Sequence, residues 1–175
     1  RIVYHEAFHQ YAFYAMNKIS SSPWFNEGNA EFFGTASVDE HRITVKEDKP
    51  MAMLIEQMIQ SGSIDIPRML HMSYEAFYGK DDKARKEHYA LAWALVYYLR
   101  KGAPLETDSP WSGILDTYSD TLMTGRNPEA ATDAAFAKVD MKAFEKDFIR
   151  FWKAGNRRAA AERNDVFKSL RDKDN

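Results

Sequence analysis

The chain has 175 residues, of which 45% are hydrophobic and 29% charged, and its formal net charge is −2. Length and composition predict one globular domain with a sizeable core. The near-neutral charge gives no electrostatic basis for binding nucleic acid or an anionic membrane, and no apolar run approaches the roughly 20 residues of a membrane span. The absence of cysteine excludes disulfides and thiolate metal ligands.

The first half of the chain reads as helix, helix and a short polar segment. Residues Ile2 to about Asn17 carry a nearly continuous apolar face, which is typical of a buried helix. A serine-rich break follows, and Pro23 can open the next element. The second helix is expected over Trp24–Gly34, with Asn26 as its candidate N-cap. Residues 35–48 are polar and contain a β-like run, which indicates a short hairpin or an extended loop.

The rest of the chain is also expected to be helical, so the predicted fold class is mainly α. Residues 73–79 are interpreted as a loop. Residues 1–155 are assigned to one domain, and the charged, alanine-rich residues 156–175 to a helical or frayed extension. The expected helices lie at about 51–61, 66–70, 81–101, 109–123, 128–138 and from 141 through 152, with a possible continuation to 170.

The most informative motif is His5-Glu6-Ala7-Phe8-His9, which has the pattern HExxH. On a helix, positions i and i+4 lie one turn apart on the same face, so His5 and His9 can converge on one metal ion. Glu6 projects toward the flank of that ion, where a metal-bound water would lie. Two imidazoles and a neighbouring carboxylate are typical of zinc hydrolases.

A catalytic zinc site needs a third protein ligand. One known arrangement places another His six residues after the second, but Ala12 and Ala15 occupy the relevant positions. The alternative is a Glu from the next helix, and Glu27 supplies it. Glu31 lies one turn further on the same face, where it could accept a hydrogen bond from the outward nitrogen of His5.

These residues carry a family resemblance. The HExxH motif followed by the segment 24–30 (Trp-Phe-Asn-Glu-Gly-Asn-Ala) resembles the gluzincin zinc metallopeptidases. The later segments 89–99 and 144–152 look like the helical half of bacterial domains called peptidase MA-like or DUF1570-like. The resemblance covers roughly residues 2–153, and the fold it implies is the helical part of a gluzincin-like peptidase.

The resemblance implies zinc-dependent hydrolysis of a peptide or protein substrate. His5, His9 and Glu27 would bind Zn²⁺, Glu6 would be the general base, and Glu31 would support a ligand. Related enzymes stabilise the oxyanion with a Tyr or His from a later helix. Tyr89 is the first candidate here and His88 the second, with Tyr74 and Tyr78 as outside candidates.

The resemblance also implies a larger parent protein. Gluzincins usually have a β-sheet before the HExxH helix, whose edge strand holds the substrate. We expect this wall upstream of Arg1 or on another chain, in a bacterial protein exported from the cytoplasm. Substrate preference and oligomeric state have no signal in the sequence.

Two other interpretations compete with the metallopeptidase. A catalytically idle binding or scaffold module that retains the metal is the alternative function, although retention of Glu6 argues against it. A di-iron helical protein needs two ExxH motifs, and the sequence has one. His41 and His71 are expected at the surface, and Arg157–Arg163 on a solvated face. The four tryptophans are expected in the core: Trp24, Trp93, Trp111 and Trp152.

Overall fold

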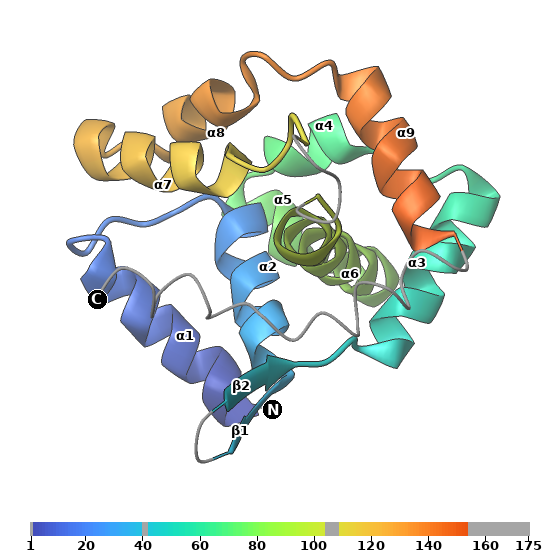
Figure 1. Cartoon of the computed structure of the whole chain (residues 1–175), viewed down its shortest axis with the longest axis horizontal. Coiled ribbons are helices and arrows are strands. Elements are labelled where there is room, and N and C mark those ends of the chain that lie inside the picture. Colours follow the sequence, from blue (N-terminus) through green and yellow to red (C-terminus); the bar gives the residue numbers. More distant parts are fainter. Residues whose placement is uncertain (1, 40–41, 104–108, 154–175) are drawn as a thin grey trace.

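The computed structural model describes residues 2–39, 42–103 and 109–153 (Figure 1). Over these residues the fold is mainly helical, with one two-stranded antiparallel hairpin, so the predicted fold class is confirmed. Two predictions fall outside the described residues: His41 at the surface, and the extension 156–175 with its Arg157–Arg163 face. The last helix ends at Trp152 and Lys153 is extended, so the expected continuation of this helix without a break toward residue 170 was wrong.

Helix α6 (Asp82–Tyr97) forms the centre of the molecule and is seen nearly end-on in Figure 1. Helices α2 (Pro23–Gly34) and α3 (Lys49–Ser61) pack directly against it. Helix α9 (Met141–Trp152) joins this core through its last residue, whose ring centroid lies 5.1 Å from that of Trp93. All four tryptophans are buried, as predicted.

The remaining elements surround this centre. The segment 73–79 is helical, so its interpretation as a loop was wrong: the Ser73 side chain accepts a hydrogen bond from Ala76 N at 3.2 Å and caps a short helix. The helix expected to end near residue 101 continues past Tyr97 as a π-helical turn. The bounds are η1 (Tyr98–Gly102), β1 (Ala36–Asp39), β2 (Arg42–Val45), α4 (Ile66–Leu70), α5 (Tyr74–Tyr78), α7 (Ile114–Gly125) and α8 (Pro128–Phe136).

The start of α2 differs from the prediction. Ser22 is the N-cap residue, in extended conformation, and Pro23 begins the helix. Asn26 is therefore not a cap, and its side chain is available for another contact. Further along α2, a Cβ on Gly28 would lie 2.5 Å from the backbone oxygen of Ala92, so the absence of a side chain lets α2 approach α6 closely.

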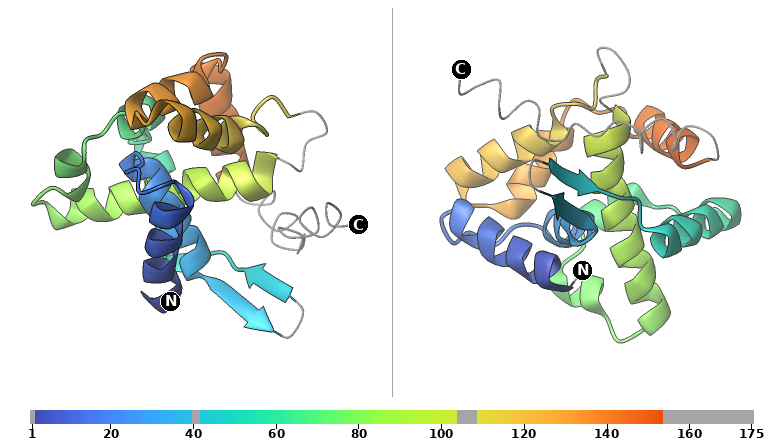
Figure 2. Two further views of the ribbon diagram at one scale, coloured as in Figure 1. Left: turned by 90° about the vertical axis from the view of Figure 1, so that its left-hand side faces the viewer. Right: turned by 60° about the horizontal axis from the view of Figure 1, so that its bottom comes forward.

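Helix α1 (Ile2–Ala15) lies at the edge of the molecule and packs on α2 (Figures 1 and 2). The prediction that it is a buried helix was wrong. Ala12 is its one buried residue, whereas Ile2 and Val3 are 77% and 76% exposed. The apolar pattern is present, but α2 covers only one side of the helix. None of the helices described here is long and apolar enough to cross a bilayer.

Candidate metal centre

Helix α1 brings the two histidines of the HExxH motif together. The Nε2 atoms of His5 and His9 lie 3.0 Å apart, and the ring planes are inclined at 82°. This follows from the spacing of one helical turn, which puts both side chains on the face of α1 that packs on α2. Both rings are partly buried.

Glu27 reaches the same point from the first turns of α2. Its Oε2 atom lies 3.6 Å from Nε2 of His5 and 3.6 Å from Nε2 of His9. The Glu27 side chain is buried, with a relative exposure of 3%. The structure thus brings together the three residues that the sequence singled out as ligands, with their donor atoms within 4.8 Å of one another.

The donor atoms of this cluster fit a zinc ion. Tetrahedral zinc ligands lie about 2.0–2.1 Å from the ion and hence roughly 3.3 Å from one another. Glu27 Oε2 is buried and has no hydrogen-bond partner among the described residues, which is costly for a carboxylate oxygen. Two imidazoles and one carboxylate are also a donor set that catalytic zinc sites use.

The outward nitrogens of both rings indicate the same tautomer. Nδ1 of His9 lies 3.1 Å from Oδ1 of Asn26, and Nδ1 of His5 lies 3.6 Å from Oε1 of Glu31. Because both facing oxygens are acceptors, they favour a proton on Nδ1 of each ring. The two Nε2 lone pairs then face each other beside a carboxylate oxygen, an arrangement that a cation between them would stabilise.

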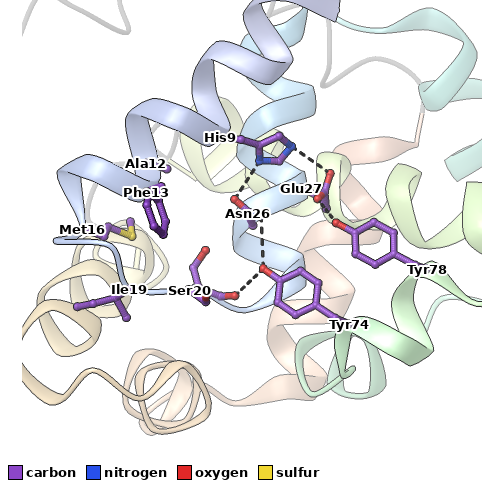
Figure 3. Close-up of a pocket in the computed structure, with 11 residues that line it drawn as sticks. His9, Ala12, Phe13, Met16, Ile19, Ser20, Asn26, Glu27, Tyr74 and Tyr78 are labelled. Carbon is purple, nitrogen blue, oxygen red and sulfur yellow. Dashed lines mark hydrogen bonds and ion pairs between the residues drawn. The ribbon is translucent and has the colours of Figure 1, made fainter.

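Asn26 belongs to a network that the sequence analysis missed (Figure 3). Its Nδ2 atom lies 3.4 Å from the hydroxyl of Tyr74, which donates to the carbonyl of Ser21 at 2.9 Å. The network therefore connects His9 through Asn26 and Tyr74 to the backbone just before α2. The sequence signal was weak: Asn26 directly precedes the proposed third ligand, but nothing local pairs it with His9.

Two tyrosines surround Glu27. The hydroxyl of Tyr78 donates a hydrogen bond to Oε1 of Glu27, the oxygen that does not face the histidines. Burial and this carboxylate raise the pKa of Tyr78 well above its usual value. Burial, followed by the charge of Glu27, raises the pKa of Tyr89 to about 12. Both phenols therefore stay protonated at neutral pH and can donate hydrogen bonds.

The remaining candidate residue Glu6, the alternative His88 and the surface residue His71 lie outside the group of three ligands. Glu6 is exposed on α1, next to His5. His88 directs Nδ1 to the carbonyl of Phe77 at 2.9 Å, and it is not a member of the His5–His9–Glu27 group. His71 is exposed as predicted and lies 3.9 Å from Asp133, far in the sequence from the cluster.

Fold and site together define a helical domain with two histidines and a buried glutamate gathered at the packing of α1 on α2. The chain belongs to a family whose description is "Protein of unknown function (DUF1570)", matched over residues 1–107. The match spans α1 through η1, and so includes every residue of the cluster and its supports. It confirms the DUF1570-like part of the resemblance, whereas the gluzincin part stays a prediction. Comparison with the curated proteins and with the solved structures gave no match.

Proposed function

We propose that this domain is a zinc-dependent hydrolase of peptide bonds. The observation that carries the proposal is the convergence of His5, His9 and Glu27, with a buried carboxylate oxygen that has no hydrogen-bond partner among the described residues. Three protein ligands leave one coordination position open, as a catalytic site requires. The proposal also depends on Glu6, which gives the site a base.

The proposed mechanism assigns a task to each residue. His5, His9 and Glu27 would hold the ion, which when bound supplies Lewis acidity and lowers the pKa of a coordinated water. Glu6 would accept a proton from the attacking water and then deliver it to the leaving amine. Its exposure on α1 leaves it accessible to water and to substrate.

The negative charge that develops on the carbonyl oxygen needs a hydrogen-bond donor. Tyr89 remains our candidate, because its raised pKa keeps the hydroxyl protonated and it shares a cavity with His5. Tyr78 is better suited to support Glu27, since its hydroxyl already donates a hydrogen bond to that carboxylate. His88 is a weaker candidate because Nδ1 is engaged by a backbone carbonyl.

A metal-retaining binding module is the second candidate function. The observation in its favour is the contrast between the ligands and the base. His5 and His9 each face a supporting oxygen, whereas the Glu6 side chain is exposed on the surface of α1. The features that would hold a metal are therefore more elaborate than those that would hold the base.

Replacement of Glu6 by Gln separates the two functions. The experiment measures zinc content by mass spectrometry and hydrolysis of a broad peptide library, in the wild-type and Glu6→Gln proteins. A hydrolase retains zinc in the variant and loses at least about a hundredfold in activity. Zinc in both proteins without hydrolysis by the wild type supports the binding module. Absence of zinc after expression in zinc-replete medium overturns both proposals.

A further inference from the structure

A cavity of about 330 Å³ adjoins the ligand cluster on the side of His9 and Glu27 (Figure 3). One wall of this cavity is apolar. It is formed by two residues in the last turn of α1, Ala12 and Phe13, and by two that follow the helix, Met16 and Ile19. The apolar wall begins one turn after His9, so a group bound near the cluster can extend directly onto it.

The opposite wall is polar, and the side chains of Tyr74 and Asn26 in it already have partners. The Tyr74 hydroxyl donates to Ser21, and Asn26 lies between Tyr74 and His9. Among the described residues that line the cavity there is no lysine, arginine or aspartate, and Glu27 is the one carboxylate. Away from the proposed zinc ion, this cavity therefore offers an acidic group no cationic side chain with which to pair.

A second cavity meets the cluster at a different ligand. It has a volume of about 470 Å³ and is lined by His5, Glu31 and Tyr89, together with the charged side chains of Arg85 and Lys86. The two cavities thus begin at His9 and at His5 and differ in chemistry. A ligand placed at the cluster can extend toward an apolar wall in one direction and toward charged groups in the other.

We propose that the cavity beside His9 binds an aromatic or long aliphatic side chain of the substrate, and so selects peptides with such a residue next to the bond that is cleaved. This inference rests on the proposed function. The cavity is at the lower end of the size range of small-molecule sites, which suits a single large side chain. Its apolar wall supplies the favourable free energy when that side chain leaves water.

The test uses two dipeptide hydroxamates, which differ only in a phenylalanine or an alanine side chain, and measures their binding by calorimetry. The proteins are the zinc-loaded full chain, Met16→Trp and Met53→Trp. Met16 lines the cavity, whereas Met53 lies on α3, is 61% exposed and lines neither cavity, so it provides the matched control. Binding of a hydroxamate does not depend on turnover.

We expect the wild type to bind the phenylalanine compound at least about tenfold more tightly than the alanine compound. Met16→Trp fills the cavity and should reduce this preference to below about threefold, while the affinity for the alanine compound stays unchanged. Met53→Trp should retain the preference of the wild type. Phe13→Ala provides a second variant, because this residue is 43% exposed and its truncation does not threaten the core. It too should reduce the preference, through loss of apolar contact.

Two failures are distinguishable. Equal affinity for the two compounds, with binding that still requires zinc, overturns the inference about the cavity and leaves the proposed function standing. A preference that survives both Met16→Trp and Phe13→Ala does the same. Failure of both compounds to bind in a zinc-dependent manner overturns the proposed function, and this inference with it.

Discussion

Oδ1 of Asn26 lies 3.1 Å from Nδ1 of His9, so an amide on α2 fixes the ring of a proposed ligand on α1. The contact joins the two helices that form the cluster, because His9 lies on α1 and Asn26 lies on α2, one residue before Glu27. The same side chain approaches the Tyr74 hydroxyl, which is held by the backbone of Ser21. The orientation of His9 therefore depends on three separate elements of the fold.

Loss of this acceptor should weaken zinc binding. We expect Asn26→Ala to lower zinc affinity about 10–100-fold, because the ring of His9 loses the group that sets its orientation and tautomer. Asn26→Asp keeps an oxygen at this position and should lose much less. Competition with a chelator of known affinity measures both variants. Equal affinities of the wild type and Asn26→Ala would show that the contact is incidental.

Packing at Gly28 should be critical for stability. A Cβ at this position would lie 2.5 Å from the Ala92 oxygen and 2.7 Å from a methyl group of Val96. Gly28→Ala should therefore lower the free energy of unfolding by about 1–3 kcal/mol. Gly125→Ala is the matched control, since a Cβ there meets no atom within 4 Å, and it should be neutral or slightly stabilising. Urea denaturation of the three proteins gives the comparison, and an unchanged midpoint for Gly28→Ala would contradict the close approach of α2 and α6.

The raised pKa of Tyr89 predicts a pH dependence of stability. The folded value is about 12 and the ordinary value is 10.0, so the folded state holds this proton more tightly than the unfolded chain does. The resulting stabilisation is complete below pH 10 and is lost as the pH rises toward 12. Denaturation of the metal-free protein should show this loss, and Tyr89→Phe should reduce it. Tyr11→Phe removes an exposed tyrosine and should leave the profile unchanged; identical profiles for Tyr89→Phe and the wild type would contradict the assignment.

The sequence predicted the cluster because its determinants are local. Helical periodicity alone puts His5 and His9 on one face, and Glu27 and Glu31 on one face of the next helix. The contact of Tyr78 with Glu27 joins residues 51 positions apart, and only the packing of α5 beside α2 brings them together. For the same reason the sequence showed that α1 has an apolar face but not whether another element covers it. The N-cap of α2 was misplaced because Asn26 has the residue type of a cap and a different partner in the fold.

The most direct test of the metal centre is calorimetric titration of the metal-free chain with zinc, in the wild type and in Glu27→Gln. The account predicts one tightly bound zinc per chain. It predicts at least about a tenfold loss of affinity in Glu27→Gln, because a carboxylate is a far better zinc ligand than an amide. Absence of zinc binding by the wild type, or equal affinity in the two proteins, would contradict a site built from His5, His9 and Glu27.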